Sequence, residues 1–480
     1  MGSPEEDSGS LGAETVEKLV DRLQSSMRLD DRRDALRALK ALSRNFRLEV
    51  GTLAMPNIVN SLKQDSRDSD IICYSLEALM NVMSDGFTLD TPNDSDLPAD
   101  LGGQFTEIFI KDIDNVKLIV GFIDAYDLHI RRFSVRFLTI LLSNRLRDVQ
   151  DIILKCPMAI SKIVDTLSDS REALRNDGLL LLIEATKGHS NIQKIVAFEN
   201  VFDRLLNIIC SEGLSDGGIV VEDCLKLLRQ LLESNPPNQT LFKEGSFIQR
   251  LKPFVSLSPE DISSQLGWSA QKVANVQLML QVIRILVSPN NKSQVTHACQ
   301  TAMNECKLLA SLCDIIMAHG IPSDVLTEAI YAVAEVIRGC SINQSYLAAL
   351  TVPSEPPQPA VTVLLISMVN DRQSLVVRQA VLYCFQCFLA SNPDGQAEIV
   401  STLLPKTAQS HDITAGQLLC RGLFSHDSLS IWFSSISFLH IIRANRRLKE
   451  ELLRVHLAPT IDSQPVSLLQ QTYSLVSQVS

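Results

Sequence analysis

Two cysteines three positions apart form the residue pair in this sequence best suited to metal or redox chemistry. Cys384 and Cys387 make a CxxC pair, which is the spacing of redox-active dithiols and of half a zinc site. A tetrahedral zinc site needs further ligands, and no second CxxC pair occurs in the 480 residues. The pair also lies inside an apolar helical pattern, QAVLYCFQCFL, without the βαβ setting of a redox site. We therefore interpret both cysteines as core residues.

Three further cysteines lie on one predicted helical stripe. Cys299, Cys306 and Cys313 recur at a spacing of seven residues, and His297 and His319 flank them. Ligands from one helix and one loop do not surround a zinc ion tetrahedrally, so core packing is the better interpretation and a zinc site is the alternative. We expect neither a metal nor a cofactor.

Two common sequence patterns of catalysis are absent, namely the GxxxxGK[ST] phosphate loop and the HExxH pair. The acid pairs Asp30–Asp31 and Glu222–Asp223 occur at predicted helix starts, where carboxylates complement the positive end of the helix dipole. Catalysis needs a preorganised pocket that excludes water. The sequence therefore predicts no catalytic residues and favours a protein that is not an enzyme.

Net charge limits the classes of binding partner. The chain has 44 Lys and Arg against 55 Asp and Glu, a net charge of −11, which opposes binding to a phosphate backbone. We expect no nucleic acid. The basic clusters are short, and most are interpreted as solvated helix faces. One of them is a candidate surface for an acidic partner or a membrane, namely Arg443, Arg446 and Arg447.

Targeting signals are also lacking in the sequence. The N-terminus, MGSPEEDSGS, has no basic region or apolar run, and Glu6 stands where a myristoylation motif needs Ser or Thr. No stretch approaches the roughly 18 apolar residues of a membrane span. Eleven cysteines are too few for a disulfide scaffold of this length. We expect a cytoplasmic, reduced protein.

The elements that carry these residues are predicted to be helices in a repeat. Apolar residues recur at i, i+3 and i+6 in nine segments, spaced about 50 residues apart, and a second amphipathic helix precedes several of them. This is close to the roughly 40–47 residues of armadillo and HEAT repeats. Such short helices must stack to bury their apolar faces. The sequence predicts an all-α, armadillo/HEAT-like α-solenoid superhelix with two helices per unit; an irregular helical domain is the alternative. The first segment is Leu36, Leu39 and Leu42, and the last is Ile436, Leu439 and Ile442.

Three stretches depart from this pattern. Residues 1–12 are predicted to be a disordered acidic tail before the solenoid at 13–480. An insertion at 84–100 has five Asp and no Lys or Arg, and is predicted to be a mobile loop. Residues 351–360 hold four prolines and are predicted to be a stiff, extended loop. A further turn, at Asp216, Gly217 and Gly218, is a candidate partner surface because glycine permits unusual backbone angles.

Longer strings resemble a known family. LGGQFTEIFIK (101–111), DSREALRNDGLLLLIEATK (169–187), GWSAQKVANVQLMLQVIRILVSP (267–289) and AGQLLCRGLFSHDSLSIWF (415–433) are examples. They are similar to the globular, armadillo-like head of the general vesicular transport factors, golgin-type vesicle tethers also called transcytosis-associated proteins. The resemblance covers 14–475 but not the family's coiled-coil rod and acidic tail. The chain is thus expected to be a fragment or a rod-less isoform. Because 466–480 is apolar and uncharged, we expect the head to be incomplete at its C-terminus, unless that segment folds back.

The resemblance implies a protein-binding scaffold in vesicle tethering and docking, for endoplasmic-reticulum-to-Golgi and intra-Golgi transport, upstream of membrane fusion. It implies a homodimer that binds a Rab-family small GTPase, other Golgi tethering factors and membrane-fusion (SNARE) proteins. It also implies peripheral association with Golgi and ER-Golgi intermediate membranes. The alternative is an armadillo peptide-binding adaptor, such as a nuclear-import-type receptor or a phosphatase-type scaffold. Import receptors use a ladder of tryptophans, and only Trp268 and Trp432 occur here.

Overall fold

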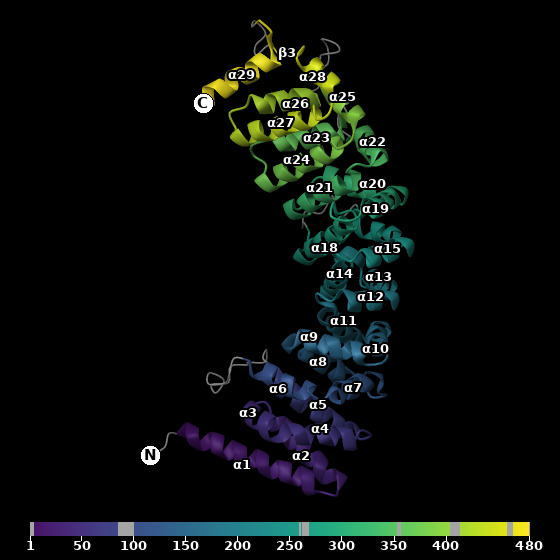
Figure 1. Ribbon diagram of the computed structural model, residues 1–480, viewed down its shortest axis with the longest axis vertical. Helices are drawn as coiled ribbons and strands as arrows, with labels where there is room; N and C mark the ends of the chain where they lie inside the picture. Colours follow the sequence, from purple (N-terminus) through teal and green to yellow (C-terminus); the bar gives the residue numbers. More distant parts are fainter. Residues whose placement is uncertain are drawn as a thin grey trace. The chain divides into compact units, whose positions relative to one another are not determined.

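The structure is a computed structural model (Figure 1). It describes residues 4–84, 100–258, 261, 268–352, 357–403, 413–457 and 464–479. The chain divides into two compact units, Met1–Ile208 with Lys226–Leu231, and Ile209–Leu225 with Leu232–Ser480. Each unit consists almost wholly of helices in the part of the chain that is described.

The first unit is built from groups of three helices, of which the third is the longest. It begins with α1 (Pro4–Ser25) and α2 (Leu29–Leu42). The next group is α3 (Arg47–Glu49) with the π-helical turn η1 (Val50–Ala54), α4 (Met55–Gln64) and α5 (Ser69–Met83). Then come α6 (Leu101–Ile110), α7 (Ile113–Gly121) with η3 (Phe122–Asp124), and α8 (Leu128–Asn144). The last full group is α9 (Leu146–Lys155), α10 (Ala159–Asp165) with η4 (Thr166–Ser168), and α11 (Glu172–Thr186), followed by α12 (Ser190–Phe198).

The second unit repeats the same grouping. Its groups are α15 (Pro236–Glu244), η6 (Ile248–Leu251) with α16 (Lys252–Val255), and α18 (Ala270–Leu286); α19 (Ser293–Glu305), α20 (Leu308–Met317) and α21 (Ser323–Ile337); α22 (Ser341–Ala349), α23 (Ala360–Val369) and α24 (Leu375–Leu389); and α25 (Pro393–Ser401), α26 (Ala415–Leu423) and α27 (Ser428–Ile441). It also holds η5 (Leu214–Asp216), α28 (Arg446–Leu452) and α29 (Leu468–Val479). Helices α13 (Val201–Ser211) and α14 (Ile219–Leu232) extend across the division between the units.

The long third helices stack in chain order within each unit. Helices α2, α5, α8 and α11 contact one another in sequence, as do α18, α21, α24 and α27, which follow one another in Figure 1. The predicted apolar stripe of α5 is fully buried, at Leu76, Leu79 and Val82. The prediction of an all-α fold with stacked amphipathic helices is confirmed.

The number of helices per repeat was predicted wrongly. The structure has a third, short helix in front of each predicted pair, such as α12, α22 and α25. These helices are only 9 residues long. They bury few apolar side chains (Ile192, Val196 and Ala197 in α12), so their hydrophobic pattern is too weak to be seen in the sequence.

The last predicted apolar stripe, Ile436, Leu439 and Ile442, is not the buried face of its helix. In α27 the buried face includes Phe433, Ser434 and Ser437, whereas Leu439 is 58% exposed. This helix is apolar on almost every side, so apolar spacing does not select the buried face. On this buried face Ser437 satisfies its hydroxyl by donating to the Phe433 carbonyl.

Three stretches outside the repeated helices were predicted to be a disordered tail, a mobile loop and an extended loop. Helix α1 begins at Pro4, so residues 4–12 are helical where a disordered tail was predicted. Residues 85–99 of the acidic insertion lie outside the described residues. The proline-rich stretch is a hairpin rather than an extended linker, because β1 (Thr351–Val352) pairs antiparallel with β2 (Gln358–Pro359). A second short hairpin joins β3 (His456–Leu457) to β4 (Val466–Ser467).

In four repeats, a glutamine on the first helix bonds to the end of the third helix of the same repeat. Nε2 of Gln344 in α22 donates to the carbonyls of Cys387 and Ala390, at the end of α24, at 3.0 and 2.8 Å. The same pair of bonds is made to the ends of α11, α21 and α27 by three other glutamines: Gln150, Gln300 and Gln396. Carbonyls in the last turn of a helix have no intrahelical donor, so each glutamine satisfies two of them. We call these four residues the clamp glutamines.

Candidate protein-interaction surfaces

The five cysteines considered in the sequence analysis all lie in the second unit. Cys313, Cys384 and Cys387 are all buried. Burial raises the pKa of the Cys313 and Cys387 thiols to about 12, and that of Cys384 well above its usual value. Their thiols therefore stay protonated at neutral pH, which disfavours both nucleophilic and metal-ligand roles. Within the described residues, no three metal-ligating side chains are grouped to hold an ion.

The turn at Asp216 is held from inside the second unit. Lys272 of α18, only 8% exposed, places its Nζ 3.0 Å from the Asp216 carboxylate and also pairs with Asp261. Nδ2 of Asn275 donates to the Gly217 carbonyl at 2.7 Å. Asp216 is thus an ion-pair partner with an exposed carboxylate, in a turn that is fixed by α18.

The two glycines of this turn differ in their surroundings. A Cβ on Gly217 would lie 2.4 Å from Val221 Cγ2 and 2.7 Å from the Glu212 carbonyl oxygen, whereas a Cβ on Gly218 would have nothing within 4 Å. Gly217 is buried and is required by close packing. Gly218 is exposed, and with Asp216 it remains a candidate contact residue.

The basic cluster near the end of α27 separates into two kinds of arginine. Arg446 and Arg447 each form an ion pair with an acid one turn later, Glu450 and Glu451, at 3.1 and 2.9 Å. Arg443 makes no ion pair with a carboxylate among the described residues. It lines a cavity of about 560 Å³, between the turn that follows α24 and the turn that follows α27. The cluster is therefore not one uniform basic patch.

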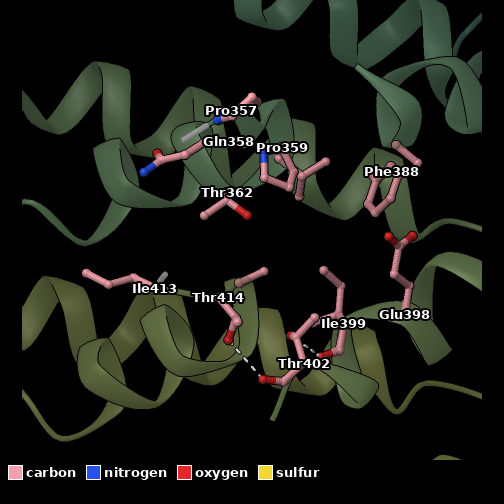
Figure 2. A pocket seen from close by; sticks show the side chains of 13 residues that line it. Pro357, Gln358, Pro359, Thr362, Phe388, Glu398, Ile399, Thr402, Ile413 and Thr414 are labelled. Carbon is pink, nitrogen blue, oxygen red and sulfur yellow. Dashed lines mark hydrogen bonds between the residues drawn. The ribbon is translucent and has the colours of Figure 1, made fainter. Parts of the chain in front are cut away.

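A second cavity, of about 320 Å³, lies beside the proline-rich hairpin. In Figure 2, Pro357 and Pro359 lie on one side of it, and Ile399 and Thr402 of the α25 end lie on the other. Thr414 Oγ1 closes the lower wall by donating to the Thr402 carbonyl at 2.9 Å. The sequence predicted only a loop here, because the cavity depends on the hairpin pairing.

An apolar groove lies between α27, α28 and α29. Its volume is about 490 Å³, and Leu439, Leu453 and Leu469 on its walls are all more than half exposed. Leucines that remain exposed together in this way are typical of surfaces that bind protein. No helix among the described residues has the length and hydrophobicity to cross a membrane.

Two segments of the chain match known protein families. Residues 341–480 match the family "Uso1 / p115 like vesicle tethering protein, head region". Residues 265–325 match the "Armadillo tether-repeat of vescicular transport factor". Over 471 residues the chain is 54% identical to the general vesicular transport factor p115 of Bos taurus, an alignment that covers 98% of this chain and 49% of the relative. The chain belongs to the Uso1/p115-like vesicle-tethering family.

More distant members of the Uso1/p115-like family support the same fold. The intracellular protein transport protein USO1 of Saccharomyces cerevisiae is 29% identical over 368 residues, covering 72% of this chain and 20% of that protein. A crystal structure of Uso1 matches with a TM-score of 0.83 at 25% identity, covering 95% of this chain and 74% of that chain. The armadillo-like fold and the family resemblance predicted from the sequence are thereby confirmed. The chain spans about half the length of its mammalian Uso1/p115 relatives.

Sequence reasoning missed two features of the structure, the clamp glutamines and His440. The clamp glutamines recur in short segments of similar pattern, such as SINQSYL and PDGQAEI, and this recurrence could have revealed them. His440 was not singled out, although it lines the same cavity as Arg443. The cavity itself depends on two turns that are distant in sequence, and the sequence carried no signal for their proximity.

Proposed function

We propose that this chain is the protein-binding head of a vesicle tether that acts between the endoplasmic reticulum and the Golgi and within the Golgi, upstream of membrane fusion. The observation that carries the proposal is the 54% identity to p115 over 471 residues, because that relative is named a general vesicular transport factor. The relatives are transport factors rather than enzymes. The names of these relatives do not support the alternative function of a nuclear-import receptor or a phosphatase scaffold.

The mechanism would be an increase in effective concentration. A scaffold that binds proteins on a vesicle and on its target membrane makes their later pairing a local event, so apparent affinity rises by roughly 10²–10⁴ without new contacts. Stacked helices suit this role, since they offer a long series of exposed turns and grooves. The groove between α27 and α29, the cavity beside the hairpin and the turn at Asp216 are such surfaces.

The proposed partners are a Rab-family small GTPase, other Golgi tethering factors and SNARE proteins, with a second copy of the chain as a homodimer. The proposed location is the cytoplasmic face of Golgi and ER-Golgi intermediate membranes, held through these partners. The support is family membership, together with the exposed leucines between α27 and α29. Light scattering at micromolar concentration tests the dimer, and a monomer mass alone would contradict it.

A transport assay tests the function itself. Purified chain 1–480, added in excess to permeabilised cells, should compete with the resident tether and slow the arrival of a cargo glycoprotein at the Golgi. Import of a nuclear cargo in the same cells should be unchanged. Slowed nuclear import with normal Golgi arrival would instead support an import-type adaptor and refute the tethering proposal.

A further inference from the structure

The cavity between the turns after α24 and α27 has a basic lining. Its lining contains two basic side chains, His440 and Arg443, and no acid. The remaining polar side chains are neutral amides and a hydroxyl: Gln386, Ser391, Asn392, Gln396 and Asn445. The chain has a net charge of −11, but the lining of this recess of about 560 Å³ carries basic groups and no carboxylate. Such a lining suits an anion.

Arg443 differs in one decisive way from its neighbours. Arg446 and Arg447 are already neutralised by Glu450 and Glu451. Arg443 has no carboxylate at ion-pair distance in the described part of the chain, and its side chain is exposed. An arginine guanidinium stays charged and offers a fork of donors that matches a carboxylate. Arg443 is therefore the cation in this cluster that is available to a partner.

The backbone that carries the two basic groups is fixed. Nε2 of Gln396, a clamp glutamine, donates to the carbonyls of His440 and Arg443 at 3.1 and 3.3 Å. The next residues are held as well, because Asn445 caps α28 by accepting from the Leu448 amide. Both side chains thus start from rigid positions, which lowers the entropy cost of holding a ligand between them.

The charge of Arg443 already acts on His440. Burial lowers the pKa of His440, and the nearby positive charge of Arg443 lowers it further. The other sides of the cavity, from α24, the turn after it and α25, contribute no titratable side chain. An anion placed between the two groups would offset their repulsion and favour the charged form of His440.

We propose that this cavity binds an acidic side chain, Asp or Glu, in an extended segment of a partner protein, with Arg443 as the principal contact and His440 as the second. The inference rests on the proposed function, since it names the chemistry of one partner segment of the tether head. A peptide fits better than an anionic membrane: the site is recessed, and the net charge of −11 opposes close approach to a negatively charged surface.

The test measures binding to purified chain 1–480 by fluorescence anisotropy. The probe is a fluorescein-labelled peptide of sequence Gly-Glu-Asp-Glu-Gly, and the control peptide replaces its acids by Gln and Asn. Arg443→Gln should weaken binding by about tenfold, as expected for one charge-assisted contact. Arg446→Gln makes the same change in net charge at a residue whose side chain is 94% exposed and already paired, and should leave binding within about twofold. Circular dichroism establishes that both variants are folded.

A second readout does not depend on mutation. With ¹³C-labelled histidine, the acidic peptide should raise the pKa of His440, and the neutral peptide should not. Equal loss of binding in both arginine variants, or no peptide binding at all, would overturn the proposal. So would binding of phosphatidylserine vesicles, but not of the peptide, in an Arg443-dependent manner. Failure here would leave the transport assay untouched, so the two proposals can fail separately.

Discussion

The guanidinium of Arg378, a side chain only 2% exposed in α24, lies 2.6 Å from the carboxylate of Asp427 at the start of α27. Its Nε donates to the Met368 carbonyl at the end of α23 at 2.8 Å, and its Cζ lies 5.1 Å from the ring centre of Phe433. One side chain therefore joins three helices of two consecutive repeats. The same arrangement occurs in the first unit, where Arg131 bonds the Ile123 carbonyl and Asp169.

Removing Arg378 should be destabilising. Arg378→Met removes the donor to the Met368 carbonyl and the cation beside Asp427, whose side chain is 28% exposed, so we expect a cost of about 1–3 kcal/mol. We expect the urea midpoint of the second unit to fall clearly. Arg372→Met, at an exposed position on the turn before α24, is the control and should change the midpoint little. Equal midpoints for the two variants would contradict the role of the buried pair.

Acid should weaken the same connection over a defined range of pH. Hydrogen bonds from Ser430 and then from Arg378 lower the pKa of Asp427 to about 2, from 3.8. The stabilisation from the depressed pKa is present above the unfolded value and is lost as pH falls through the folded value. Between pH 4 and pH 2 the free energy of unfolding should therefore decline less steeply in Asp427→Asn than in the parent chain. Parallel slopes would show that Asp427 does not contribute.

The two glycines after Asp216 should respond oppositely to the same change. Gly217→Ala forces Cβ against Val221 and the Glu212 backbone, so overpacking should cost about 1–3 kcal/mol. Gly218→Ala has open space and should be neutral within about 0.5 kcal/mol. Thermal unfolding of both variants measures this. If Gly218→Ala instead lowered partner capture at unchanged melting temperature, Gly218 would be a contact residue as the sequence predicted.

Gln344→Leu tests the clamp glutamines. Leucine has a similar volume but removes the side-chain donor to the Cys387 and Ala390 carbonyls, and the Cys387 carbonyl keeps only the bond from the Ala390 amide at 3.4 Å; the loss should cost about 1–3 kcal/mol. Gln373→Leu, at an exposed position, is the matched control and should be close to neutral. Hydrogen exchange adds a local readout, since amides of α22 should lose protection before those of α18. A loss of protection spread evenly over the second unit would argue against a local clamp.

The sequence predicted the fold well where apolar spacing and burial coincide. Leu76, Leu79 and Val82 lie at helical spacing and are fully buried, so the long third helices could be placed from their pattern alone. In α27 the apolar spacing predicted the wrong buried face, because Leu439 is exposed and Ser434 is buried. Amphipathicity cannot orient a helix whose every face is apolar.

The candidate surfaces were less predictable for a related reason. Arg446 and Arg447 each have a glutamate four residues later and Arg443 does not, a local spacing that distinguishes them and that the sequence analysis did not use. Lys272 gave no signal, because its acidic partners Asp261 and Asp216 lie 11 and 56 residues before it, beyond the spacing of neighbours on one helix. Charge pairing across turns depends on tertiary contacts, which local spacing does not encode.

The clamp glutamines also bear on how this chain can vary in evolution. Each one closes a loop of the backbone, 35 residues from Gln150 to Ala185 and 43 from Gln344 to Cys387. Lengthening a closed loop costs little, about 0.6 kcal/mol for each doubling. The proline-rich hairpin lies inside the loop closed by Gln344, so its residues can be added, lost or exchanged while the helices around it stay in register. The length of a repeat can therefore change between the two hydrogen-bonded ends of its loop, and new surface loops can arise while the helix packing is kept.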